Sequence, residues 1–193
     1  MKKRRTPAYI MGKISVICIL MILLCSGNAA AVERDELRLN AGLDMFLSLL
    51  SADLDITKKQ GNDGFLTLLL IYNDNKRKAQ DLADTLGSLK KIREIPIRVE
   101  ITDDITMSSY MDNPPAGIFI TQPLGKKLPE LIQYSVNKGI ILFSPFRGDV
   151  EKGVLGGIHI TDRVLPYVNS LSIKSSGIRI KKFFLRVSEI YGS

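Results

Sequence analysis

The chain has 193 residues, of which 45% are hydrophobic and 24% are charged, and its formal net charge is +7. This length and apolar content predict one globular domain with an ordinary core. The positive charge is unevenly placed, because five of the 27 basic residues lie in the first 31 positions, which hold no acid. The remaining 22 basic and 20 acidic residues carry about +2, so nucleic acid is not expected as a partner.

The first 31 residues follow the three-part pattern of a secretory signal. Basic residues precede an apolar run over 14–24, and Ala29 to Ala31 provide the small residues that a signal peptidase accepts. The run is shorter than the roughly 20 residues that cross a bilayer. We therefore expect cleavage after Ala31, a periplasmic mature chain over 32–193 and no stable membrane insertion. An uncleaved anchor stays open as the alternative.

Both cysteines, Cys18 and Cys25, lie in the segment that is expected to be removed. A lipid anchor is not expected, because Leu24 stands where a small residue should precede Cys25. The mature chain then holds no thiol, which excludes a disulfide framework, thiolate catalysis and a cysteine-rich metal site.

The first half of the mature chain predicts helix, strand, helix and strand. Residues 33–50 place leucines and a phenylalanine at helical spacing, and the continuous apolar run over 65–72 is typical of a strand covered on both faces. Asn73, Asp74 and Asn75 provide turn and capping side chains for a helix whose apolar stripe extends to Leu89 and which ends near Lys90 and Lys91. Residues 95–102 alternate in polarity, as a half-buried strand near a sheet edge does.

The second half begins with a long loop over 103–115 that has no clean period and ends in two prolines. Short apolar strands are predicted over 116–121 and 140–144, and the segment between them is a predicted helix that should end at Gly139. The alternation of strands and helices predicts a layered α/β domain with a mainly parallel sheet. An antiparallel hairpin over 158–169 should follow, with Pro166 where no neighbour needs its missing N–H.

The last residues predict an amphipathic basic helix that packs on the sheet. Its apolar side carries Ile180, Phe183, Phe184 and Val187, and Lys181, Lys182 and Arg186 form the other side. Three cations are a modest number for a helix that lies on a membrane. We take Phe183 and Phe184, together with His159 on the exposed side of the hairpin, as candidate contacts with a partner protein.

Patterns typical of catalysis or cofactor binding are weak. Gly153, Gly156 and Gly157 precede a strand and lack the spacing of a dinucleotide fingerprint, so they should allow a close backbone approach instead. Gly125 with its two following lysines lacks the pattern of a nucleotide-binding loop. His159 is the single histidine, and no serine stands in a G-x-S-x-G setting. We expect no cofactor and no metal.

Two carboxylate pairs, Asp53 with Asp55 and Asp103 with Asp104, lie in predicted loops. Such pairs can perform acid and base chemistry, but loop acids are usually solvated. A hydrolase that uses them is a remote alternative, and neither pair has the ligand spacing of a calcium loop.

The C-terminal part has a defined order of motifs. Gly156 and Gly157 lead into a short strand, a second strand ends at Asn169, and Gly177 interrupts the segment before the last helix. In this order the motifs resemble those of the YfiR-like family of periplasmic proteins. The similarity extends over about residues 64–190. This chain departs from the family because it lacks tryptophan and its mature part lacks cysteine, so redox switching is not carried over.

The resemblance implies an α/β binding protein that holds the periplasmic part of an inner-membrane diguanylate cyclase inactive and thereby lowers cyclic-di-GMP. It also implies self-association, with a homodimer as the expected form. Such regulation needs only a higher affinity for the inactive conformation. A periplasmic solute-binding or transporter-accessory protein is the alternative, although a two-lobed solute binder normally has a longer chain.

Overall fold

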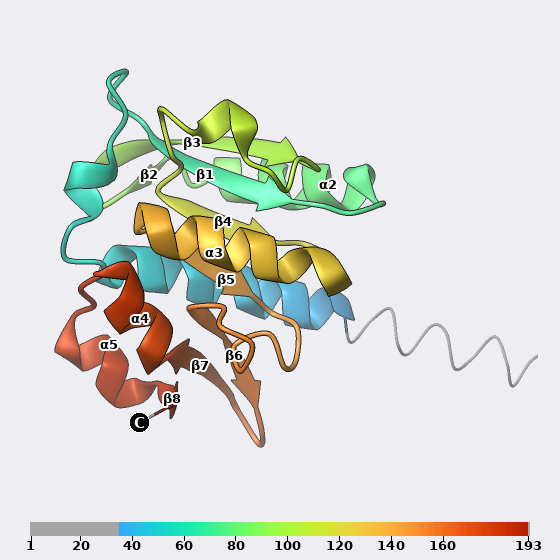
Figure 1. The fold of residues 1–193 in the computed structure, drawn as a ribbon, viewed down its shortest axis with the longest axis vertical. Helices are drawn as coiled ribbons and strands as arrows, with labels where there is room; N and C mark the ends of the chain where they lie inside the picture. The colour runs from blue at the N-terminus through green and yellow to red at the C-terminus, as the bar shows by residue number, and fades with distance from the viewer. Residues whose placement is uncertain (1–34, 193) are drawn as a thin grey trace, which may run out of the picture. The chain divides into compact units, whose positions relative to one another are not determined.

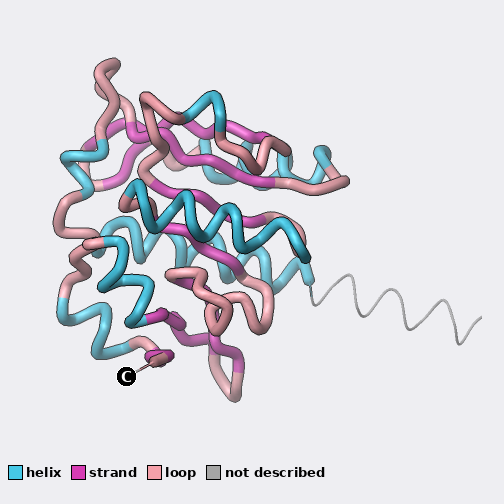
Figure 2. The backbone as a smooth tube through the Cα atoms, viewed as in Figure 1, coloured by secondary structure: helices cyan, strands magenta, loops and turns pink. Residues whose placement is uncertain are grey.

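The computed structural model describes residues 35–192, and residues 39–193 form one compact unit, to which the following account refers. The predicted signal segment lies outside the described residues, so its cleavage remains a prediction. Eight strands form one sheet in the order β2-β3-β1-β4-β5-β6-β7-β8 (Figures 1 and 2). The predicted α/β fold with a mainly parallel sheet is confirmed.

The centre of the sheet is parallel and covered on both faces. It comprises β3 (Ile95–Thr102), β1 (Leu66–Ile71), β4 (Gly117–Ile120), β5 (Ile141–Ser144) and the start of β6 (Gly156–Ile160). All side chains of β1 are buried, with Leu68 and Leu70 in one core cluster and Leu69 and Ile71 in the other. An unbroken apolar run is what two covered faces require.

Helices divide between the two faces. The first helix, over residues 39–52 of this unit, and α2 (Lys76–Gly87) pack on the larger cluster, whereas α3 (Leu128–Lys138) packs on the smaller one (Figure 1). Phe46, Phe119 and Phe143 meet in the larger cluster with ring centroids 5.6–5.8 Å apart. This aromatic centre fixes the first helix against the middle of the sheet.

The helix ends agree with the predicted start and stop signals. The Asn75 side chain accepts a hydrogen bond from the Lys78 N–H at 3.0 Å and caps α2, which ends at Gly87, slightly before the expected Lys90. Gly139 ends α3 in a left-handed conformation. Three short 3-10 helices complete the connections: η1 (Ile56–Lys59), η2 (Ser108–Tyr110) and η3 (Gly125–Lys127).

The edge next to β3 is formed by β2 (Lys91–Ile92), a two-residue antiparallel strand. The other end of the sheet is the predicted hairpin of β6 and β7 (Val164–Asn169), which is antiparallel as expected. Pro166 lies beyond the residues of β7 that pair with β8, which are Tyr167 to Asn169. Its missing N–H is therefore tolerated.

The predicted C-terminal helix is partly wrong. The structure has α4 (Ser170–Ser176), which was not expected, a six-residue α5 (Lys182–Val187), and a third strand, β8 (Glu189–Tyr191), that pairs parallel with β7. Over so few residues the apolar spacing does not distinguish a helix from a strand. The free edge of β7 has backbone N–H and C=O groups, and β8 pairs with them. A continued helix would leave these groups without a strand partner.

Candidate functional site

The carboxyl edge of the parallel strands is closed by a side chain of the protein itself. Ligands of open α/β sheets bind at this edge where the strand order reverses, here between β1 and β4. Gln122 follows β4, and its Oε1 accepts hydrogen bonds from three successive N–H groups, those of Asn73, Asp74 and Asn75, at 3.0, 2.9 and 3.1 Å. Its Nε2 donates to the Asn75 carbonyl at 2.8 Å. The N–H groups before α2 are therefore already occupied.

The glycines at the start of β6 serve packing, as predicted. A Cβ atom on Gly157 would stand 2.7 Å from the Ser144 carbonyl oxygen, and one on Gly156 would collide with Leu49 of the first helix. Both backbones approach their neighbours more closely than a side chain permits. Gly153 lies in the preceding turn with a φ of +118°.

Asn169 organises the junction between β7 and α4. Its Oδ1 accepts a hydrogen bond from the Ser172 N–H at 2.9 Å, which caps α4, and its Nδ2 donates to the Val150 carbonyl at 2.7 Å. The residue is buried, and its side chain satisfies backbone groups where β7 ends. Gly177 ends α4.

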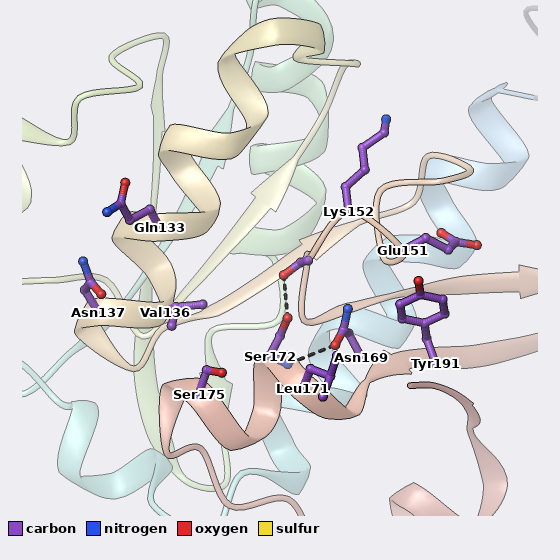
Figure 3. Close-up of a pocket in the computed structure, with 11 residues that line it drawn as sticks. Gln133, Val136, Asn137, Glu151, Lys152, Asn169, Leu171, Ser172, Ser175 and Tyr191 are labelled. Carbon is purple, nitrogen blue, oxygen red and sulfur yellow. Dashed lines mark hydrogen bonds between the residues drawn. The ribbon is translucent and has the colours of Figure 1, made fainter. Parts of the chain in front are cut away.

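A cavity of about 410 Å³ opens beside Asn169 (Figure 3). Gln133 and Asn137 line it from α3, and Ser175 lines it from α4. Glu151 and Tyr191 lie at the other side, from the turn before β6 and from β8. Val136 and Leu171 also line the cavity, so its wall is mainly apolar with a few amide, hydroxyl and carboxylate groups, as small-molecule sites usually are. The sequence had pointed to Gly153 and Asn169 among the lining residues, and most of the others come from segments that are distant in the chain.

His159 forms an aromatic pair on the hairpin. Its ring meets the Tyr167 ring edge-on, with centroids 5.4 Å apart, and the Tyr167 hydroxyl donates to Glu151 at 3.3 Å. Burial, followed by the Glu151 carboxylate, raises the pKa of Tyr167. Within residues 35–192, no group of three or more His, Cys, Asp or Glu side chains is arranged to hold a metal ion.

The two candidate phenylalanines have opposite environments. Phe183 is 56% exposed on α5, whereas Phe184 is only 4% exposed and belongs to the larger core cluster. The expected place of Phe184 at a partner surface is therefore wrong, because the short helix turns this ring toward the sheet. Phe183 and the half-buried His159 remain predictions as partner contacts.

Two of the carboxylates singled out above have structural partners. Asp53 is fully buried and pairs with Lys59 at 2.8 Å, and Asp55 receives two hydrogen bonds from Arg179 at 2.7 and 2.6 Å. The Arg179 bonds, followed by the one from Lys58, hold the pKa of Asp55 well below its usual range.

The other pair and the two lysines have simpler roles. Asp104 accepts from Thr106 and Ser108 and shapes the loop before η2, and Asp103 is exposed. Lys127 of η3 donates to the Asn73 side chain at 2.9 Å, and Lys126 is exposed.

Large exposed apolar side chains gather toward the end of the chain. Six of the ten in the described part lie after residue 159: Ile160, Val164, Leu171, Phe183, Val187 and Tyr191. Ile160 and Val164 face each other across the hairpin and are 45% and 37% exposed. We call this pair the hairpin tip. An exposed apolar pair of this kind is a candidate contact for a partner.

No family model matches the chain, and no curated protein matches it. Among solved structures, the chain is similar to the ABC domain in complex with L-Trp from Streptococcus pneumonia, with 10% identity and a TM-score of 0.54 over 78% of this chain and 60% of that one. It is also similar to a conserved domain protein from Vibrio cholerae O1 biovar El Tor, with 12% identity and a TM-score of 0.50 over 69% of this chain and 57% of that one. The chain thus spans about 60% of these proteins, and the likeness shows the fold alone.

Proposed function

We propose that this chain is a non-catalytic, periplasmic regulatory protein that binds the periplasmic part of an inner-membrane signalling protein. The resemblance to the YfiR-like family supports a diguanylate cyclase as that partner, with cyclic-di-GMP as the output. The mature domain binds the inactive conformation more tightly and so shifts the population toward it. Self-association into a homodimer, which the same resemblance implies, is tested by sedimentation equilibrium.

The hairpin tip is the observation that carries the proposal. Ile160 and Val164 are apolar, β-branched and exposed at the far end of β6 and β7, so they contribute little buried surface to the isolated domain. Burying them against a partner would remove apolar surface from water. The closed carboxyl edge at Gln122 supports the same conclusion, because the usual ligand position of an open α/β sheet is already occupied.

The test uses the tagged domain from Val32 onward as bait against detergent-solubilised inner membranes. We expect it to retain a membrane protein that has a periplasmic sensor and a cytoplasmic cyclase domain. The double substitution Ile160→Asp with Val164→Asp should abolish retention without lowering the melting temperature. Met111→Asp, which changes an equally exposed side chain outside the hairpin, is the matched control. Retention that survives the hairpin substitutions would exclude this surface.

A solute-binding function is the second candidate, favoured by the cavity beside Asn169, which has a mainly apolar wall with a few polar groups. The fold neighbour from Streptococcus pneumonia was described in complex with L-Trp. A ligand that binds the folded state raises the melting temperature by mass action. A thermal-shift screen of amino acids and other small polar solutes therefore distinguishes the two functions. A rise that Ser175→Trp removes would favour solute binding at this cavity.

A further inference from the structure

Cations outnumber acids where the first helix ends and η1 begins. Five basic side chains from three parts of the chain lie at Asp53, Asp55 and the neighbouring end of the first helix. Lys59 pairs with Asp53, and Arg93 donates to the Asp53 carbonyl at 2.9 Å. Lys58 and Arg179 both bind Asp55, and Lys181 lies within 3.4 Å of the Ser51 carbonyl.

The position of α5 extends this positive region. The backbone joins the two parts, since the Lys181 N–H donates to the Ala52 carbonyl and the Leu54 N–H donates to the Arg179 carbonyl. Lys182 and Arg186 of α5 are exposed, and neither forms an ion pair with another residue of the range 35–192. Glu189, at the start of β8, is the exposed acid that follows the helix.

Apolar groups lie among these cations. Phe183 and Val187, one helical turn apart, are both more than half exposed on α5. A groove of about 570 Å³ has Leu185 and Ile190 among its lining residues, together with Lys182 and Arg186. The surface made by Lys182, Phe183, Leu185, Arg186, Val187 and Ile190 is called the α5 face below.

We propose that the α5 face docks this protein on an anionic lipid surface. Lys182 and Arg186 would bind headgroup phosphates, while Phe183 and Val187 would enter the boundary between headgroups and acyl chains. The basic residues around Asp53 and Asp55 would add long-range attraction. Such docking is peripheral, and no helix within residues 35–192 is long and apolar enough to span a membrane. It does not rest on the hairpin tip or on any protein partner.

Two observations favour a lipid surface over an acidic protein. Lys182 and Arg186 are exposed and form no ion pair within residues 35–192, so they are available to the closely spaced phosphates of a headgroup layer, which need no fixed arrangement of carboxylates. The groove also joins an apolar floor to two cations within one small area, which matches the junction of a headgroup and its acyl chain.

The test is sedimentation with vesicles. The protein from Val32 onward is used, because the apolar run of the signal would itself bind lipid. We expect at least tenfold tighter binding to vesicles of phosphatidylcholine with 30% phosphatidylglycerol than to phosphatidylcholine alone, and weaker binding as salt is raised. Lys182→Glu with Arg186→Glu should lower the affinity at least fivefold, and Phe183→Ser should also lower it. Lys76→Glu with Arg77→Glu makes the same charge change on α2 and should retain most binding.

Three results would overturn the proposal. The first is equal or absent binding to the two vesicle types. The second is equal loss in the α5 and α2 charge variants, which would indicate net charge without a defined face. The third is binding of labelled poly-L-glutamate, but not of vesicles, with loss in the α5 variant, which would assign the face to an acidic protein. Each variant is first checked for an unchanged melting temperature, and the hairpin-tip pull-down is independent of all three results.

Discussion

Gly156 of β6 lies so close to Leu49 of the first helix that a Cβ atom on the glycine would stand 2.5 Å from the Leu49 Cδ2. The same atom would be 3.0 Å from the Phe143 ring. The first helix and the C-terminal hairpin are far apart in the sequence, and this contact fits them together without space for one methyl group. The arrangement of the hairpin on the sheet therefore depends on the absence of a side chain.

Gly156→Ala should lower the free energy of unfolding by about 1–3 kcal/mol, because the added methyl overpacks a closed contact. Urea denaturation measures the change. The matched control is Gly87→Ala at the end of α2, where an added Cβ meets nothing within 4 Å. That substitution should be neutral or slightly stabilising. Equal effects at the two positions would contradict the close contact between β6 and the first helix.

Gln122→Ala should destabilise the domain by about 1–3 kcal/mol, since three N–H groups before α2 lose their acceptor together. Gln122→Glu retains an acceptor oxygen but loses the bond from Nε2 to the Asn75 carbonyl, so its effect should be smaller. Thermal or urea unfolding of the two variants gives the order. A glutamate variant that is less stable than the alanine variant would contradict the acceptor role.

Asn169→Ala should cost about 2–4 kcal/mol, because the cap of α4 is lost and the Val150 carbonyl loses its donor. Asn169→Asp keeps the cap and removes only the donor, and should therefore lie between the alanine variant and the wild type. Circular dichroism melting of the three proteins checks this order. Identical melting temperatures for Asn169→Asp and the wild type would show that the Val150 bond contributes nothing.

These contacts show how far the sequence could predict the fold. The strands over 65–72 and 140–144 were predicted because an apolar run without alternation indicates a strand that is buried on both faces of the sheet. The cap of α2 was predicted because polar side chains at 73–75 precede an apolar stripe, whereas the cap at Asn169 was not predicted, because α4 itself was not expected. β8 was missed because a three-residue strand has no period of its own and exists only where the edge of β7 is available. Phe184 was misplaced because the apolar spacing does not decide which of the two adjacent phenylalanines packs on the sheet and which stays exposed.

Asp55 should contribute to the pH dependence of stability. Its pKa is lowered in the folded state, first by the hydrogen bonds from Arg179 and then by Lys58. A lowered folded-state pKa stabilises the fold above the unfolded pKa of about 4, and this contribution disappears as the pH falls further. Asp55→Asn should therefore make the fall in unfolding free energy between about pH 5 and pH 2 shallower.

The Asp55 prediction has an internal control in its partner. Arg179→Gln removes the first cause of the lowered pKa, so it should make the same slope shallower. The double variant should add little to either single change, because both substitutions remove one interaction. Additive effects would show that the two side chains act separately.

The candidate surfaces were less predictable than the fold. The sequence suggested three cations on the last helix, whereas the positive region around it also includes residues such as Lys58 and Arg93, which only the folded chain brings there. The cavity beside Asn169 likewise combines residues of α3, α4 and β8. The hairpin tip was not predicted, because the alternation placed His159, and not Ile160, on the exposed side of the strand. In the structure Ile158 is buried, whereas Ile160 is 45% exposed.

The most direct test of the central claim is the cyclic-di-GMP content of the native host. Deletion of the gene should raise it, and the wild-type chain expressed from a plasmid should restore the original level. The Ile160→Asp with Val164→Asp variant should be exported and folded, yet fail to restore that level. An unchanged cyclic-di-GMP content after deletion, or full restoration by the hairpin variant, would contradict regulation through this surface.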